Sequence, residues 1–314
     1  MNASAGCPAT SASRTPRAIA VGAFDGVHLG HQAVVRSVIE AAERLDITSA
    51  ALTFEPTPRQ FFARDPGADR RLTPDPERLG LLCRLGVQQV LVQTFDRDLR
   101  QMTPEEFARR ILLEELDARF VAIGASHTFG SGAGAGPDSM RELGTRLGFE
   151  VDIVPLVAAG AHSVSSTAIR EALTDGDLAP ANAMLGRPYS LTGTVVRGRG
   201  LGADLQAPTA NLDLPPEKLL PADGVYAAAA LLAGESAARP AAISLGPSPT
   251  FGIEETRVEV HLLDFGGDLY GSELAVALLE RLRPIQEFAN RDELIAQIKR
   301  DVEQVRAVCA AMTQ

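Results

Sequence analysis

A change in hydrophobic periodicity near Pro188 divides this chain into two parts of different fold class. Before it, short apolar runs alternate with segments whose apolar residues recur at helical spacing. After it, polar and apolar residues alternate along runs that turn residues separate. The first pattern predicts a parallel, doubly wound α/β sheet. The second predicts an antiparallel sheet or a small β-barrel.

The first part is predicted to hold five strands. They are the runs Ala18–Gly22, Thr48–Phe54, Val87–Gln93, Phe120–Gly124 and Glu150–Val154. Helices are expected between and after them, at Gly30–Leu45, Pro76–Leu85, Thr103–Leu116, Met140–Leu147, Ser166–Leu173 and Leu178–Leu185. The helix from Thr103 begins with Thr-Pro-Glu-Glu, which predicts a capping box with proline at the first helical position.

The second part begins after Gly186-Arg187-Pro188, which ends the last of these helices. Its predicted strands are Tyr189–Arg197, Gly224–Leu231, Arg257–Asp264 and Glu273–Leu282, and Arg291–Met312 is expected to be a helix across the barrel. We place a disordered tail at residues 1–16, an α/β domain at 17–186 and a β-barrel domain at 187–314.

The composition indicates which partners and which cellular compartment to expect. The formal net charge is −10, whereas proteins that bind nucleic acid usually present an excess of basic residues. The three cysteines are far apart in the sequence, which argues against a disulfide framework or a zinc site. No apolar run is long enough for a membrane span, and the N-terminal residues lack the apolar core of a signal peptide. We therefore expect a cytoplasmic protein with small-molecule partners, and neither nucleic acid nor membrane as a partner.

The turn after the first strand has the features of a phosphate site. It reads Val21-Gly-Ala-Phe-Asp-Gly-Val-His-Leu-Gly-His31 and leads directly into a helix. The N-terminus of a helix offers free N–H groups and a positive dipole end to an anion. His28 and His31 are three residues apart, so both imidazoles are expected on the same side, where they can stabilise charge on phosphate oxygens. The pattern resembles the nucleotidyltransferase signature, and class I aminoacyl-tRNA synthetases carry a similar motif.

A second helix start carries hydroxyl groups and a cation. Ser165, Ser166 and Thr167 precede or open the helix, and Arg170 lies one turn further on. These groups suit the phosphates of ATP. An ordinary helix N-cap is the alternative for this cluster.

The barrel part carries a second set of candidates. Thr209 and Asn211 lie two residues apart in Pro208-Thr-Ala-Asn211, after a glycine-bearing turn at residues 197–202, and both offer oxygen ligands suited to Mg²⁺. Glu259 lies in the alternating run Arg257–His261 and can take a proton from an attacking alcohol. Each of these signals alone also fits a plain turn or a solvated strand.

Taken together, these motifs resemble the prokaryotic bifunctional riboflavin kinase/FAD synthetase family. The likeness runs from about Ala18 to about Val308. Its strongest elements are Gly22-Ala-Phe-Asp-Gly-Val-His-Leu-Gly-His31, Thr53-Phe-Glu-Pro56, Val164-Ser-Ser-Thr-Ala-Ile-Arg170, Pro208-Thr-Ala-Asn211, Asp223-Gly-Val-Tyr226 and Val258-Glu-Val-His-Leu-Leu-Asp-Phe265.

The resemblance implies a Rossmann-like FMN adenylyltransferase domain followed by a riboflavin kinase barrel. Riboflavin would be phosphorylated by ATP to FMN and ADP, and FMN would react with a second ATP to give FAD and pyrophosphate, with Mg²⁺ at both sites. In the first domain the implied catalytic and ATP-binding residues are Gly22, Phe24, Gly26, His28, His31, Ser165, Ser166, Thr167 and Arg170. In the second, Glu259 is the implied base, Thr209 and Asn211 hold Mg²⁺, and ATP is bound by Gly198, Gly200, Gly202, Pro208 and Thr209.

The chain departs from the family pattern at two places. Ser126 and His127 stand where the family has Asn or Asp followed by Phe, at a position near the nucleotide or flavin. Gln206 and Ala207 replace the Gly-Phe that normally precedes Pro-Thr-Ala-Asn. These departures leave two alternatives open: a diverged paralogue with one active domain or a modified flavin substrate, and a flavin-binding protein without catalysis.

Overall fold

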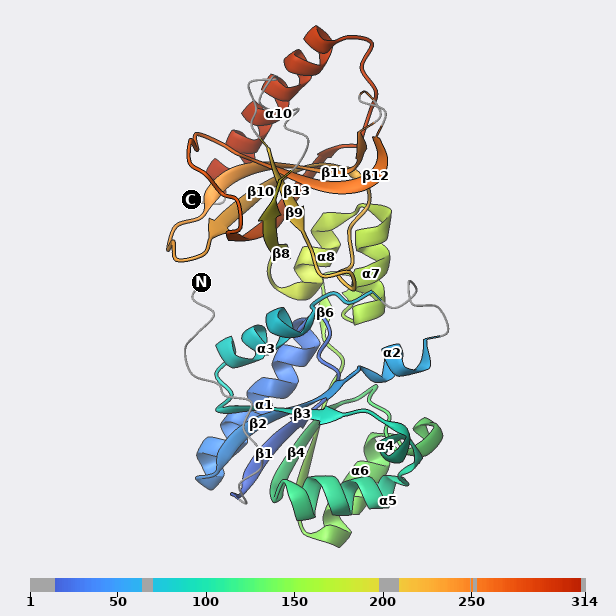
Figure 1. The fold of residues 1–314 in the computed structure, drawn as a ribbon. Coiled ribbons are helices and arrows are strands. Elements are labelled where there is room, and N and C mark those ends of the chain that lie inside the picture. The colour runs from blue at the N-terminus through green and yellow to red at the C-terminus, as the bar shows by residue number, and fades with distance from the viewer. Residues whose placement is uncertain (1–14, 64–69, 198–208, 249, 251–252, 312–314) are drawn as a thin grey trace. The chain divides into compact units, whose positions relative to one another are not determined.

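The computed structural model describes residues 15–63, 70–197, 209–248, 250 and 253–311 (Figure 1). Contacts within the chain divide it into two compact units, one up to Ser166 and one from Thr167 onward. The first unit contains a parallel sheet and the second a closed barrel. Both fold classes predicted from the change in periodicity are therefore confirmed. None of the helices in the described ranges has the length and apolar character needed to cross a membrane.

The first unit is built on a five-stranded sheet with the order β3-β2-β1-β4-β5. Its strands, which are all parallel to their neighbours, are β1 (Arg17–Val21), β2 (Thr48–Glu55), β3 (Gln89–Thr94), β4 (Ala118–Gly124) and β5 (Glu150–Val154). The helical segments are α1 (Leu29–Leu45), α2 (Pro58–Phe62), α3 (Asp75–Arg84), α4 (Arg97–Gln101), α5 (Pro104–Glu106), the π-helix η1 (Phe107–Glu115), the short 3₁₀ turn η2 (Ser131–Ala133) and α6 (Pro137–Leu147). A small hairpin of β6 (Ala158–Ala159) and β7 (His162–Ser163) follows β5.

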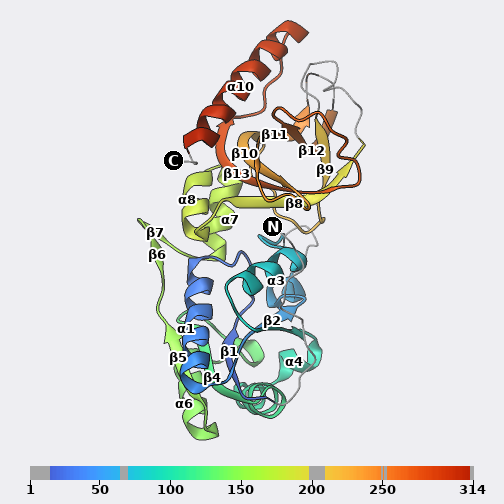
Figure 2. The ribbon, with the colours of Figure 1, turned by 90° about the vertical axis from the view of Figure 1, so that its left-hand side faces the viewer.

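Both faces of this sheet are buried, as the continuous apolar runs predict. In β1, Ile19 and Val21 join a cluster with residues of η1 and α6, whereas Ala18 and Ala20 join a cluster with residues of α1 and α3. Helices thus cover the two faces of the sheet (Figure 2). The predicted capping box at Thr103 is confirmed, since its hydroxyl accepts from the N–H of Glu106 at 3.2 Å.

The strand order places a ligand site at the end of β1. The chain goes from β1 to β2 on one side of the sheet, and β4 lies on the other side of β1. In open α/β sheets, ligands bind outside the carboxyl ends of the strands where the order reverses. The turn after β1 and the segment after β4 therefore face the same crevice.

The second unit is a closed barrel with the strand order β10-β11-β12-β9-β8-β13. Its elements are α7 (Ser166–Asp175), α8 (Leu178–Leu185), β8 (Tyr189–Val196), β9 (Ala210–Asp213), β10 (Gly224–Leu232), β11 (Arg239–Ser248), β12 (Ile253–Leu262), β13 (Glu273–Arg283) and α10 (Arg291–Ala311). The α10 helix packs on the barrel through Val305 against Ala227 and Leu263, as its periodicity predicts.

Two features of the barrel unit differ from the sequence patterns. The strands β9 and β11 were not predicted. β9 has only four residues, and in β11 Pro240, Gly246 and Pro247 are residues that strands disfavour. The pairing of β11 with β10 on one side and β12 on the other fixes its place. The helices α7 and α8 group with the barrel, whereas the sequence patterns place the domain boundary after them. Asn182 of α8 explains part of this grouping, since its amide donates to the carbonyl of Leu278 in β13 at 3.0 Å.

Candidate functional site

The turn between β1 and α1 has an unusual backbone. Phe24, Gly26 and Val27 have φ angles of 53°, 87° and 42°, in the left-handed region that side chains other than glycine rarely adopt. Such conformations persist only where surrounding structure holds them, and they cluster at ligand sites. The turn is therefore built by the tertiary structure around it.

Hydrogen bonds from a distant segment hold this turn. The carboxylate of Asp25 accepts from the backbone N–H groups of Leu72 and Thr73, at 3.2 and 3.0 Å. The N–H of Gly26 donates to the hydroxyl of Thr73 at 2.8 Å. On the other side, the hydroxyl of Ser166 donates to the carbonyl of Asp25 at 2.8 Å. These bonds fix the turn before any ligand arrives.

A buried guanidinium joins the turn to the neighbouring strand. Arg78 is 0% exposed and donates to the carbonyl of Ala23 at 2.8 Å and to that of Phe54 at 3.3 Å. It also pairs with Asp75 at 2.6 Å and with Glu55 at 3.5 Å. Burial lowers the pKa of Arg78, and the two carboxylates partly offset this. Arg78 thus connects the ends of β1 and β2.

The two histidines of the turn form one rigid pair. His28 is the N-cap of α1, and its Nδ1 accepts from the N–H of His31 at 3.3 Å. The imidazole rings stack with centroids 3.6 Å apart and an angle of 15° between their planes. The ring of Phe24 meets His31 edge-on at 5.3 Å. As the spacing predicts, both rings lie together at the N-terminus of α1.

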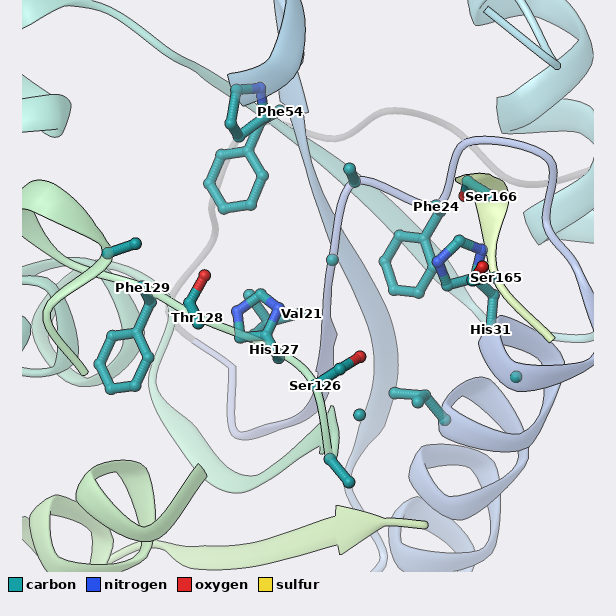
Figure 3. A pocket seen from close by; sticks show the side chains of 18 of the residues that line it. Val21, Phe24, His31, Phe54, Ser126, His127, Thr128, Phe129, Ser165 and Ser166 are labelled. Carbon is teal, nitrogen blue, oxygen red and sulfur yellow. The ribbon is translucent and has the colours of Figure 1, made fainter. Parts of the chain in front are cut away.

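These residues border a pocket of about 650 Å³ at the carboxyl ends of the sheet strands. One part of its wall is polar and lies at the helix starts, where the side chains of His28, His31, Ser165 and Ser166 line it. Figure 3 shows Phe24, His31, Ser165 and Ser166 close together on one side of the view. Thr167 and Arg170 follow on α7, which groups with the second unit, and neither lines this pocket.

The opposite part of the wall is aromatic. It is lined by Phe54, Phe62, Phe95, Phe107 and Phe129. Phe95 contacts Phe54 and Phe62 edge-on at 6.1 and 6.0 Å, and Phe107 lies 6.1 Å from Phe129. The guanidinium of Arg100 lies over the ring of Phe62 at 5.1 Å. An apolar pocket end of this kind suits a flat heteroaromatic ring.

The sequence analysis did not identify this aromatic wall. Its residues come from five separate segments: the end of β2, α2, the residue after β3, η1 and the turn after β4. The spacing of residues within one segment therefore cannot predict that these five side chains lie close together. Phe54 and Phe129 stood in stretches that were compared with the family pattern, Thr53–Pro56 and Gly124–Gly130, but neither was predicted to line a pocket.

Ser126 and His127, which depart from the family pattern, both line the pocket. The His127 ring is nearly parallel to that of Phe129, with centroids 6.3 Å apart and an interplanar angle of 16°. Burial lowers the pKa of His127 to about 4, so the imidazole is neutral at pH 7. Ser126 is exposed beside it.

The barrel unit brings Asn211 and Glu259 together. They are direct partners on the antiparallel strands β9 and β12, so their side chains share one face of the sheet. The adjacent pair, Ala210 and Val260, is buried on the opposite face. Burial raises the pKa of the Glu259 carboxyl, and Arg257 partly opposes this. Thr209 immediately precedes β9 and is partly exposed.

Some predicted residues of the kinase site lie outside the described part of the chain. They are Gly198, Gly200, Gly202 and Pro208, together with the departures Gln206 and Ala207. Among the residues that the structure does describe, no group of three or more His, Cys, Asp or Glu side chains is arranged to hold a metal ion.

Comparison with known proteins finds the same two parts. Residues 10–168 match the family model described as FAD synthetase, and residues 185–309 match that of riboflavin kinase. Relatives named bifunctional riboflavin kinase/FMN adenylyltransferase include the protein of Escherichia coli (strain K12), 38% identical over 90% of this chain and 90% of its own. Those of Pseudomonas fluorescens and Bacillus subtilis (strain 168) are 36% and 31% identical, over 92% and 91% of this chain and 92% and 90% of their own.

A solved structure has a similar fold over nearly the whole chain. It is from Streptococcus pneumoniae, is described as a macrolide-efflux protein, and is 31% identical. The TM-score is 0.85, and the match covers 94% of this chain and 95% of the other. With both family models matched in order and relatives aligned along almost their full length, the chain belongs to the bifunctional riboflavin kinase/FMN adenylyltransferase family.

Proposed function

We propose that this protein makes both flavin cofactors, phosphorylating riboflavin to FMN with one ATP and adenylylating FMN to FAD with a second. The observation that carries the proposal is a pocket with two unlike walls. One wall has the stacked histidines at a helix N-terminus, and the other has five phenylalanines. A substrate that joins a flat ring system to a phosphate matches both walls.

In the adenylyl transfer, the flavin ring lies against the aromatic wall and the triphosphate of ATP lies at the start of α1. Gly22 and Gly26 keep the backbone of the turn close to the phosphates, and Phe24 supports the ring of His31. The FMN phosphate attacks the α-phosphorus of ATP, the bond to the β-phosphate oxygen breaks, and pyrophosphate leaves. His28, His31 and Ser165 donate hydrogen bonds to the charge that grows on phosphate oxygens. Ser166 borders the same site and holds the turn by donating its hydroxyl to the carbonyl of Asp25. Thr167 and Arg170 remain candidates for binding the triphosphate because the family resemblance implies them.

In the phosphoryl transfer, Glu259 accepts the proton of the terminal ribityl hydroxyl as its oxygen attacks the γ-phosphorus of ATP. The raised pKa of Glu259 makes it a stronger base than an ordinary glutamate. Mg²⁺ held by Thr209 and Asn211 would neutralise phosphate charge. The donor set fits this ion, because the side chains of Asn211 and Glu259 share one face of the sheet and Thr209, two residues before Asn211, adds a hydroxyl. Gly198, Gly200, Gly202 and Pro208 are the further ATP-binding candidates that the family resemblance implies.

The domains follow from these assignments. By the sequence patterns, residues 17–186 form the FMN adenylyltransferase and residues 187–314 the riboflavin kinase, and the helices α7 and α8 at the end of the first group with the barrel in the structure. The partners are riboflavin, FMN and ATP, and the place of action is the cytoplasm.

The test is a time course with riboflavin, ATP and Mg²⁺, in which the flavins are separated by chromatography. FMN is expected first and FAD second, and a parallel reaction started from FMN gives FAD directly. Glu259→Gln is expected to abolish FMN formation while the FMN-fed reaction continues. FAD only from FMN would indicate a chain with one active domain. Flavin binding without ATP consumption would support a binding protein and refute both enzymatic activities.

A further inference from the structure

His127 occupies a distinctive place on the pocket wall. It lies in the turn after β4, where its backbone N–H donates to the carbonyl of Gly124 at 2.9 Å. Its ring extends the aromatic wall, because it lies nearly parallel to Phe129. In Figure 3 the His127 ring lies between Phe129 on one side and Phe24 and His31 on the other. His127 thus lines the same pocket as the aromatic wall and the histidine pair.

The imidazole has a polar edge to which the residues that the structure describes offer no hydrogen-bond partner. Within the described part of the chain it makes the ring contact with Phe129 and no side-chain hydrogen bond. A ligand that fills the pocket removes water from this edge. A polar group that loses water without gaining a partner lowers the affinity for the ligand, so a ligand that binds well brings a polar group to this position.

The chemistry of the ring indicates which polar group fits. A neutral imidazole donates from one nitrogen and accepts at the other. A hydroxyl also both donates and accepts, so it can pair with either nitrogen. A neutral ring offers no charge to a phosphate, whereas the N-terminus of α1 lies beside His28 and His31 for that purpose. In FMN, the segment between the ring system and the phosphate is the ribityl chain, which carries hydroxyls.

We propose that His127 is a specificity-determining residue of the adenylyltransferase site, which hydrogen-bonds a ribityl hydroxyl and so selects flavin phosphates whose linker is a polyol. The inference rests on the proposed function, since it assumes that FMN occupies this pocket. It also gives the departure from phenylalanine a physical role. The ring keeps the aromatic contact with Phe129 and adds a hydrogen bond that phenylalanine lacks.

The experiment compares two substrates and two variants. The substrates are FMN and an analogue in which a pentyl chain replaces the ribityl chain, with the same ring system and phosphate. The variants are His127→Phe, which keeps an aromatic ring without hydrogen-bonding atoms, and His127→Gln, which keeps a donor and an acceptor. His162→Phe is the matched control, because it makes the same substitution at an exposed position of the same unit outside the pocket.

We expect the wild-type chain to have a higher kcat/KM for FMN than for the pentyl analogue. His127→Phe is expected to reduce this preference about tenfold, the equivalent of one hydrogen bond, by losing activity on FMN alone. His127→Gln restores part of the preference, and His162→Phe leaves it unchanged. FMN binding without ATP, measured by quenching of flavin fluorescence, weakens in His127→Phe by a similar factor.

Two results would overturn the inference while leaving the proposed function intact. In one, His127→Phe keeps the wild-type preference for FMN. In the other, it loses activity equally on both substrates, which would indicate a structural role. If the wild-type chain makes no FAD from FMN, the proposed adenylyl transfer itself fails, and the inference fails with it. Riboflavin phosphorylation by the same preparations confirms that the variants are folded.

Discussion

At the residue scale, His28 and His31 form one rigid pair, because their rings stack and the His28 side chain caps α1 by accepting from the N–H of His31. His31 is also supported edge-on by Phe24. Held in this way, the donors need no rearrangement as charge develops on the phosphates, which is the condition for strong electrostatic stabilisation.

Replacement of His31 by Asn is expected to lower kcat for FAD formation from FMN by about 10²–10³-fold, the usual effect of removing one preorganised donor. Riboflavin phosphorylation in the same variant should be unchanged, because the barrel carries its own candidate residues. Steady-state rates with each flavin measure both effects. An equal fall in the two activities would contradict the assignment.

Glu259 leads to a prediction on the pH dependence of the kinase reaction. A base must be deprotonated to act, and burial raises the pKa of this carboxyl. The rate of riboflavin phosphorylation is therefore expected to fall on acidification at a pH above the ordinary glutamate pKa of about 4.3. Arg257 opposes the rise in this pKa, so Arg257→Ala should move the acidic limb of the pH profile, where the rate falls, to still higher pH. Profiles of kcat/KM for both proteins provide the measurement, and an unmoved limb would exclude Glu259 as its source.

His127 affects the pH dependence of stability. Burial lowers its pKa from 6.5 to about 4, so the unfolded chain binds more protons between these pH values. The free energy of unfolding should therefore decrease as the pH is lowered through this range, by at most about 1.4 kcal/mol per pH unit from this group. His127→Phe removes that part of the slope. Urea unfolding at several pH values, followed by far-UV circular dichroism, tests this against His162→Phe, and identical slopes would refute it.

At the scale of elements, the turn after β1 depends on segments far from it in the sequence. Its strained residues are held through Asp25 by the chain at residues 72–73 and through Ala23 by Arg78 of α3. The helix α3 thus positions the phosphate site without lining the pocket.

Arg78→Met is expected to lower the free energy of unfolding of the first unit by about 2–3 kcal/mol. This is less than the loss of a fully buried ion pair, because Asp75 and Glu55 are partly exposed. All three tyrosines, Tyr189, Tyr226 and Tyr270, lie in the barrel unit, and the chain has no tryptophan. Tyrosine fluorescence should therefore show an unchanged transition, while circular dichroism shows an earlier one. A shift in the tyrosine signal would mean that the two units unfold together.

At the scale of the whole molecule, each proposed reaction has candidate residues concentrated in its own compact unit. FMN is the product of one site and the substrate of the other. A mixture of Glu259→Gln and His31→Asn chains is therefore expected to convert riboflavin to FAD, although each variant alone makes little FAD from riboflavin. Chromatography of the mixture tests this, and FMN supplied to Glu259→Gln alone is the control. FMN that accumulates in the mixture without FAD would refute transfer between chains.

The sequence by itself determined the features that depend on local chemistry. Periodicity predicted both fold classes, because burial on two faces and on one face leave different patterns along a strand. Thr103 and Glu106 predicted their capping box, and the histidine spacing predicted the pair at the start of α1, because these contacts join residues three apart. The motifs, above all Gly22–His31, contain enough of the site residues to indicate the family.

Only the tertiary structure decided what depends on distant segments. The aromatic wall gathers five phenylalanines from separate elements, and nothing in their spacing reports it. The strand β11 forms despite its prolines because two neighbours pair with it. Asn211 and Glu259 share a face through a register that the sequence leaves open. Likewise, the sequence shows His127 only as a residue in a turn. Its contact with Phe129, its place in the pocket wall and the burial that lowers its pKa depend on the tertiary structure. Packing between remote segments sets these features, and local sequence does not encode it.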